Sequence, residues 1–175
     1  KYFEGMHFDD GAKIAKAGRV NTPLLNALCT DDFFNLSMPK TTGPEVFNLA
    51  YLKAAQALSN TQDLTHQDVM ATLNAFSANV ISAAIKECAK NKGNCVVYAS
   101  GGGIHNPLLM EQLLTLCPEV KAFKNTQVLG IDPDAKEAVL FAILANECLA
   151  GEKQHFKGCS QGIAGVTMGK ISFPD

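Results

Sequence analysis

The chain has 175 residues, of which 47% are hydrophobic and 18% are charged, and its formal net charge is −2. This length suffices for one domain or two small ones, and the apolar share suffices for a buried core. The near-neutral charge does not suggest a nucleic-acid groove or a polybasic anchor, and the apolar runs are far shorter than the roughly 20 residues that cross a bilayer. We therefore expect neither nucleic acid nor a membrane as a partner.

The six cysteines indicate reduced thiols rather than disulfides or a metal site. No two of them lie two to four residues apart, which excludes the usual zinc knuckle. Several stand in apolar runs, as small buried side chains do. We expect a cytoplasmic protein. The positions are Cys29, Cys88, Cys95, Cys117, Cys148 and Cys159.

The first 35 residues predict two short helices. Residues 10–20 form the first, which closes at Gly18, and residues 21–29 form the second. Asn21 is a suitable cap for the second helix, and Pro23 stands in its first turn.

A loop over residues 31–43 precedes a third predicted helix over residues 44–58. Phe33 and Phe34 are expected to pin the loop to a core. In the helix, apolar residues recur at helical spacing and predict one packed face. They are Val46, Leu49, Ala50 and Leu52 or Lys53.

Residues 66–93 carry the longest helical pattern. Thr65 and Asp68 resemble a capping box, with Asp in place of the usual Glu. Gly93 is expected to end the helix. Frequent Ala and Ser predict close packing against a sheet or another helix. The predicted apolar face consists of Val69, Leu73, Phe76, Val80, Ala84 and Cys88.

The second half alternates strands and helices. The predicted elements are a buried strand (95–100), a helix capped by Asn106 with Pro107 at its first position (106–117), a strand (120–125), a helix ended by Gly151 (132–151) and a terminal strand (165–173). This alternation predicts an α/β layer architecture.

Three consecutive glycines, Gly101, Gly102 and Gly103, connect the first strand to the helix capped by Asn106. Glycine lets a ligand approach the backbone, and a helix N-terminus offers free N–H groups and about half a positive charge. The spacing matches neither the dinucleotide fingerprint nor the GxxxxGK[ST] phosphate loop. The triplet alone is equally consistent with a phosphate-approach turn and a plain tight turn.

Two further polar groups favour plain structural roles when taken alone. Asp132, Asp134 and Glu137 lie at a helix start, where acidic residues complement the helix dipole. One of them could instead hold a ribose or a metal-bound water. Lys40 and the residues after it precede a predicted helix, where the lysine could meet a phosphate or remain a solvated cation. The four histidines share no metal-ligand spacing, so no metal site is expected.

Three segments in order resemble the C-terminal half of the anhydro-N-acetylmuramic acid kinases. They are "MPKTTGPEVFN" (38–48), "ASGGGIHNPLLM" (99–110) and "GIDPDAKEAVLFAILANECLAGE" (130–152). The closing stretch 165–174 resembles the terminal strand of that family. Each motif is moderately specific, and the ordered set is specific.

The resemblance implies an actin/hexokinase-like (ribonuclease H-like) ATPase fold of the α/β class, with helices packed on a mixed sheet and ATP between two domains. Residues 1–42 would link the halves, residues 43–175 would form the C-terminal nucleotide-binding lobe, and the N-terminal lobe would be absent from this chain. The chain starts at Lys1 and reads directly into mid-domain sequence, which agrees with that expectation.

The implied activity is hydrolysis of the 1,6-anhydro bond of the sugar with phosphorylation of O6, using Mg²⁺ and ATP, in bacterial cell-wall recycling. By resemblance, Gly101, Gly102, Gly103 and Asn106 would back the adenosine and α-phosphate. Asp134 and Glu137 would lie near the same cleft. Lys40, Thr41, Thr42 and Gly43 are weaker candidates for the nucleotide side. The implied partners are the sugar, ATP, the N-terminal half and, through alanine-rich helices, a second copy in a homodimer.

The chain also departs from the family pattern. The GTSxDG phosphate loop and the DTGPGN segment with its general-base aspartate do not occur. We therefore place no catalytic residue or metal ligand in this chain and expect it to be inactive alone. Thr41 and Pro44 stand where the family usually has Ser and Arg. Two alternatives stay open: a non-catalytic actin-like module for nucleotide binding or assembly, and another sugar kinase of the superfamily.

Overall fold

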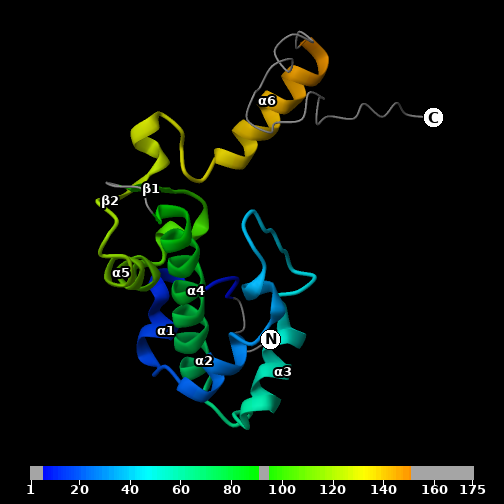
Figure 1. Ribbon diagram of the computed structural model, residues 1–175, viewed down its shortest axis with the longest axis vertical. Coiled ribbons are helices and arrows are strands. Elements are labelled where there is room, and N and C mark those ends of the chain that lie inside the picture. Colours follow the sequence, from blue (N-terminus) through cyan, green and yellow to red (C-terminus); the bar gives the residue numbers. More distant parts are fainter. Residues whose placement is uncertain (1–5, 91–94, 151–175) are drawn as a thin grey trace, which may run out of the picture. The chain divides into compact units, whose positions relative to one another are not determined.

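The computed structural model describes residues 6–90 and 95–150, and these are mainly helical (Figure 1). The α-helices are α1 (Lys13–Ala17), α2 (Thr22–Leu28), α3 (Leu49–Ser59), α4 (His66–Ala89), α5 (Pro107–Leu116) and α6 (Lys136–Ala150). The strands are β1 (Val96–Ala99) and β2 (Ala122–Asn125). Contacts divide the chain into two compact units, residues 1–98 with 102–124 and residues 99–101 with 125–175. The predicted boundary between residues 42 and 43 stays a prediction.

The two predicted N-terminal helices are confirmed. Gly18 is the C-cap of α1, and the side chain of Asn21 caps α2 by accepting a 2.9 Å hydrogen bond from the Leu24 N–H. A Cβ on Gly18 would lie 2.0 Å from the backbone oxygen of Gln67 in α4. Only glycine therefore lets the chain leave α1 this close to the start of α4.

Helix α4 is the element against which α1, α2 and α5 pack. The predicted N-cap is confirmed, because Thr65 Oγ1 accepts from the Asp68 N–H. The reciprocal arm of a capping box is replaced by a tertiary bond, since Asp68 Oδ1 accepts from the Arg19 N–H at 2.7 Å. The predicted stop at Gly93 lies outside the described residues.

The predicted apolar face of α4 is only partly correct. Val69 is buried, but Cys88 is exposed, and the other predicted members are half-buried. Small and polar residues are buried instead, because short side chains let three helices approach α4 on several sides. They are Ala71, Thr72, Asn74, Ala75, Ala78, Ser82 and Ala89.

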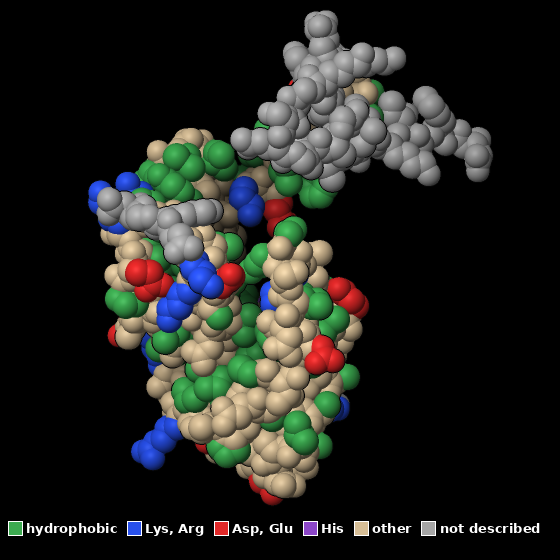
Figure 2. All heavy atoms as spheres, in the orientation of Figure 1, with side chains coloured by type: hydrophobic (Ala, Val, Ile, Leu, Met, Phe, Trp, Pro, Cys, Tyr) green, Lys and Arg blue, Asp and Glu red, His purple; other side chains and the backbone are tan. Residues whose placement is uncertain are grey.

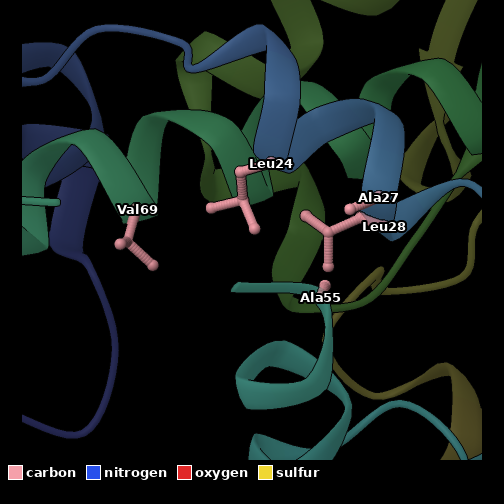
Figure 3. Packing of buried hydrophobic residues seen from close by; sticks show 5 residues of the cluster. All are labelled: Leu24, Ala27, Leu28, Ala55 and Val69. Atoms are coloured by element: carbon pink, nitrogen blue, oxygen red, sulfur yellow. The ribbon is translucent and has the colours of Figure 1, made fainter. Parts of the chain in front are cut away.

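One core cluster joins α2, α3 and α4 (Figure 3). Leu24 and Leu28 of α2 are fully buried and meet Ala55 of α3 and Val69 of α4. Ala27 completes the cluster, and half-buried side chains such as Leu73 pack around it. Burying a leucine of this kind stabilises the fold by about 1.5–3 kcal/mol.

The predicted start of the third helix at Gly43 and Pro44 is wrong. Residues 44–47 form a turn, and α3 begins after Asn48, whose Oδ1 accepts from the backbone N–H groups of Ala50 and Tyr51. The amide of Asn48 also donates to the Pro44 carbonyl, so its side chain closes the turn and caps the helix. The face predicted for this helix is wrong in part as well, because Leu49 is 48% exposed.

Aromatic side chains pin the loop before α3, as predicted. The ring of Phe34 lies 5.6 Å from that of Phe76 in α4 and 5.5 Å from that of Phe47. Phe33 packs edge-on against both Phe34 and Phe47. Tyr51 adds its ring 5.0 Å from Phe47 and donates its hydroxyl to the Leu28 carbonyl. Burial, with smaller contributions from Asp31 and Cys29, raises the pKa of Tyr51 to about 12.

Strands β1 and β2 pair in parallel across α5, which gives one βαβ unit. The described residues are mostly helical and contain a two-stranded parallel sheet rather than the mixed sheet that was expected. The prediction that the first strand is buried is wrong here, because Tyr98 is 45% exposed. A sheet of two strands has few neighbours to cover it. The predicted terminal strand 165–173 lies outside the described residues.

Helix α6 begins at Lys136, close to the predicted position, and the predicted stop at Gly151 lies outside the described residues. None of its residues is buried, although it is rich in apolar side chains. Phe141 is 67% exposed, and Leu140, Ile143 and Leu149 are exposed as well. Helices that are apolar on most sides are usually covered by another layer of protein.

By length and composition, α4 is the one described helix that could cross a membrane. The same composition is found in core helices, and three helices pack against α4. Its buried Thr72 is also fully satisfied, accepting from the Asn21 N–H and donating to the Asp68 carbonyl. We interpret α4 as a core helix.

Lys and Arg side chains form no continuous stripe on the face shown in Figure 2.

The Asp68 contact predicts a pH dependence of stability. The backbone hydrogen bond from Arg19, and then the bond with Thr65, lower the pKa of Asp68 below its ordinary value of 3.8. A depressed carboxylate pKa stabilises the fold above the unfolded-state pKa and loses that effect as pH falls through the folded-state value. Wild type should therefore have a higher Tm than Asp68→Asn near pH 6, and the difference should shrink toward pH 3. A difference that is constant or grows on acidification would contradict this account.

Candidate functional site

The three glycines have different backbone roles. Gly101 has φ +83°, and its N–H donates to the Pro133 carbonyl at 2.9 Å. Gly102 and Gly103 begin a short 3₁₀ turn over Gly102–His105 and are exposed. Neither has a left-handed φ. Backbone conformation therefore requires glycine at the first of the three positions.

Space around the turn sharpens this distinction. A Cβ added to Gly102 would meet nothing within 4 Å, and one added to Gly103 would meet only Leu109 Cδ2 at 3.8 Å, an ordinary van der Waals contact. The described fold therefore tolerates a side chain at both positions. It gives no steric reason for glycine at these two positions. A requirement for glycine there would come from a group outside the described fold that contacts the turn.

Asn106 is the predicted N-cap of α5, and its Oδ1 accepts from the Leu109 N–H at 2.9 Å. Its backbone N–H donates to the Gly103 carbonyl, and its carbonyl accepts from the Met110 N–H. Pro107 has no N–H. Among the described residues, Leu108 supplies the first-turn N–H that these bonds leave without an acceptor. The helix start can therefore offer one backbone donor to an anion.

A chain of side-chain amides lies behind this cap. Asn106 Nδ2 donates to Asn74 Oδ1 at 2.8 Å, and Asn74 Nδ2 donates to Gln112 Oε1 at 2.9 Å. Sequence reasoning missed Asn74. Its position between Leu73 and Ala75 in an apolar helix was a weak signal, because a polar residue there is usually solvated.

The acidic residues at the start of α6 make a local turn. Asp132 Oδ1 accepts from the Asp134 N–H at 2.9 Å, and the Asp132 carbonyl accepts from the Ala135 N–H. Asp132, Asp134 and Glu137 are exposed. Within residues 6–90 and 95–150, no group of three or more acidic, histidine or cysteine side chains could hold a metal ion.

Most of the hydrogen-bond donors of Lys40 are used within its own loop. Its ammonium donates to the carbonyls of Phe33 and Phe34 at 2.9 and 3.0 Å and lies 4.9 Å from the centre of the Phe33 ring. Two of its three donors are thereby used. This contact holds the loop closed and leaves one N–H for a ligand.

Thr42 and Gly43 follow Lys40 and differ in character. The buried hydroxyl oxygen of Thr42 has no hydrogen-bond partner among the described residues, which is costly for a hydroxyl unless another group binds it. The Gly43 carbonyl accepts from the Val46 and Phe47 N–H groups and so shapes the turn before α3. A Cβ on Gly43 would meet the movable end of the Glu45 side chain at 2.5 Å.

The sequence-predicted residues fall on both compact units. Lys40, Thr42, Gly43, Gly102, Gly103 and Asn106 belong to the first, and Gly101, Asp134 and Glu137 belong to the second. Within the first unit the structure joins Gly103 to Asn106, and within the second it joins Gly101 to Pro133.

A parallel βαβ unit whose strand enters its helix through a glycine turn is typical of the nucleotide-binding α/β proteins. Residues 1–171 match the family model for anhydro-N-acetylmuramic acid kinase, so the chain belongs to that family. Membership implies an actin-like ATPase fold.

Curated relatives agree with the family match. The chain is 69% identical over its whole length to an anhydro-N-acetylmuramic acid kinase of Pseudoalteromonas translucida (strain TAC 125) and 59% identical to one of Pseudoalteromonas atlantica (strain T6c / ATCC BAA-1087). A Vibrio cholerae relative of the same name is 36% identical over 168 residues, 96% of this chain. In all three cases the chain spans 44% of the length of the relative.

The two glycine environments predict opposite effects of alanine. Gly101→Ala forces a left-handed φ on an L-residue and should lower the free energy of unfolding by about 1–2 kcal/mol. Gly102→Ala should leave it unchanged or raise it by up to about 1 kcal/mol, because it restricts the unfolded chain without strain. Thermal or urea unfolding of the two variants measures the difference. Equal destabilisation by both would contradict the described turn.

Proposed function

We propose that this chain is the nucleotide-binding lobe of an ATP-dependent anhydro-N-acetylmuramic acid kinase. The complete enzyme would hydrolyse the 1,6-anhydro ring and phosphorylate O6 of the sugar, in the peptidoglycan recycling of a bacterial cytoplasm. The family match over residues 1–171 carries this proposal. Within it, residues 1–42 link the lobe to the preceding half, and residues 43–175 form the lobe.

The glycine turn supports a role in holding ATP. Gly102 and Gly103 are exposed, and the fold leaves space for side chains at both. A nucleotide bound against this backbone would leave no room for a Cβ at either position, which would explain the two glycines. Leu108 offers its N–H at the start of α5, where the helix dipole favours a phosphate oxygen. Gly101 sets the direction in which the chain enters the turn, and Asn106 fixes where the helix starts.

The remaining predicted residues take lesser parts in this proposal. The unpaired Thr42 hydroxyl would gain a partner from a ligand polar group, and Gly43 would keep the backbone beside it accessible. Lys40 would act mainly by closing the loop that presents Thr42. Asp134 and Glu137 are exposed and could accept from ribose hydroxyls.

Magnesium would reach the site with ATP. The described residues contain no group of three or more acidic, histidine or cysteine side chains that could hold a metal ion. Mg²⁺ bound to ATP supplies charge neutralisation during phosphoryl transfer. The general base that activates water at the anhydro carbon would also belong to the preceding half. The chemistry thus divides between a half that reacts and a lobe that holds the nucleotide.

The exposed apolar surface of α6 is consistent with a second part of the kinase that packs against this lobe. This helix exposes a group of large apolar side chains, and exposed apolar patches usually mark a protein–protein interface. The side chains are Leu140, Phe141, Ile143 and Leu149. The relatives are more than twice as long as this chain, so they have further chain with which to cover it. We assign this role to the preceding half of the kinase. A homodimer through alanine-rich helices stays a prediction.

Kinase activity tests the proposal directly. The protein encoded by the full open reading frame should release ADP only when ATP and anhydro-N-acetylmuramic acid are both present. The 175-residue chain alone should show no turnover, because the general base is outside it. ADP release with another sugar only would favour a different kinase of the superfamily. No turnover, with nucleotide binding retained, would favour a non-catalytic actin-like module.

A bulky residue in the turn separates nucleotide binding from folding. In the complete protein, Gly102→Val should raise KM for ATP about tenfold or more, because its side chain occupies the space assigned to the nucleotide. KM for the sugar and Tm should change little. Thr115→Val, an exposed isosteric change on α5, is the matched control and should alter none of these values. An unchanged KM for ATP in Gly102→Val would remove the turn from the site.

A further inference from the structure

The amide chain from Gln112 through Asn74 to Asn106 has a fixed direction. The Leu109 N–H can only donate, so Asn106 must turn its Oδ1 toward it, and the bond is 2.9 Å long. The amide nitrogen of Asn106 then faces Asn74, which must present its oxygen. The nitrogen of Asn74 in turn faces Gln112 Oε1. A single backbone N–H thus sets the orientation of all three amides.

Asn74 is the least exposed of the polar groups that reach this cap. It is 8% exposed and lies on α4, between half-buried Leu73 and buried Ala75. A buried amide left without partners is costly, so Asn74 strongly favours the side-chain rotamer of Asn106 that satisfies it. The central helix therefore acts on the first turn of α5 through one hydrogen bond of 2.8 Å.

Asn106 connects the glycine turn to α5 through its backbone hydrogen bonds. Its N–H donates to the Gly103 carbonyl at 3.1 Å, and its carbonyl accepts the first hydrogen bond of the helix, from Met110. A shift of Asn106 would move both the exposed backbone of Gly103 and the unpaired N–H of Leu108. Both groups are among those that the proposed function brings to the nucleotide.

We propose that Asn74 is a positioning residue for nucleotide binding, which acts through Asn106 to hold the turn Gly102–His105 and the start of α5 in their binding geometry. This inference rests on the proposed function and identifies a determinant of that site on α4. Asn74 does not contact the nucleotide in this account. Its effect is on ATP affinity and not on the chemical step.

The test is a set of variants in the complete kinase, assayed with ATP and anhydro-N-acetylmuramic acid. Asn74→Leu removes both of its amide bonds and should raise KM for ATP about five- to tenfold, the equivalent of about one hydrogen bond. The values of kcat and KM for the sugar should stay within about twofold. Gln112→Leu is the matched control, because it removes the other bond of Asn74 and leaves the bond to Asn106. It should change KM for ATP by less than about twofold.

A double-mutant cycle shows whether the two asparagines act through one bond. Asn106→Ser retains a good N-cap but cannot reach Asn74, so it should raise KM for ATP by a similar factor. The double variant should be no worse than either single variant, because the same bond is lost. Multiplied effects, or equal effects of Asn74→Leu and Gln112→Leu, would overturn the proposal.

Two outcomes keep this inference distinct from the proposed function. If wild type turns over and Asn74→Leu leaves KM for ATP unchanged, the positioning role is overturned and the kinase assignment stands. If wild type shows no turnover with ATP and the sugar, the kinase assignment is overturned, and equal ATP affinity of wild type and Asn74→Leu would overturn the positioning role as well. Should Asn74→Leu fail to fold, Asn106→Ser alone decides, since it cuts the same bond and keeps the cap. An unchanged KM for ATP in that variant overturns the role.

Discussion

The first unit depends on the close approach of the N-terminal segment to the start of α4. Gly18 permits it, since any side chain there would collide with the Gln67 backbone oxygen. Two hydrogen bonds then fix the register, from the Arg19 N–H to Asp68 and from the Asn21 N–H to Thr72. Because α4 is anchored in this way, α1, α2 and α5 can all pack closely against its small side chains.

The same helix connects the core to the candidate site. Thr72 and Asn74 lie two residues apart, so they point to different sides of α4. Thr72 binds the N-terminal segment, and Asn74 binds the cap of α5. The polar residues buried in α4 are therefore not defects of an apolar helix. Thr72 and Asn74 each replace water with a hydrogen bond to another element, and so fix that element in place.

Local chemistry was predictable from the sequence, and long-range pairing was not. The caps at Asn21, Thr65 and Asn106 were predicted because each depends on residues within three positions of the helix start. The start of α3 was mispredicted, because Asn48 competes with Pro44 as a helix boundary and its side chain can close a turn as well as cap a helix. Helical periodicity alone does not show which boundary a chain uses.

Burial was the least predictable property. Apolar spacing on α4 identified Val69 but missed the small residues, since alanine and serine carry little periodic signal. The short β1 was predicted as buried from composition, whereas only one strand pairs with it among the described residues. For the site, the glycines and Asn106 were identifiable from their order along the chain. Asn74 was not, because its meaning comes from a partner 32 positions away.

The glycine turn combines a conformational requirement with an open surface. Gly101 is fixed by its φ, while Gly102 and Gly103 leave space that the described fold does not use. The central claim is that a nucleotide occupies this space. Amide hydrogen exchange in the complete protein, with and without a non-hydrolysable ATP analogue, tests it most directly. The account predicts that the analogue slows exchange in residues 99–110 and leaves residues 66–89 little changed. Protection confined to other segments, with exchange in residues 99–110 unaltered, would contradict it.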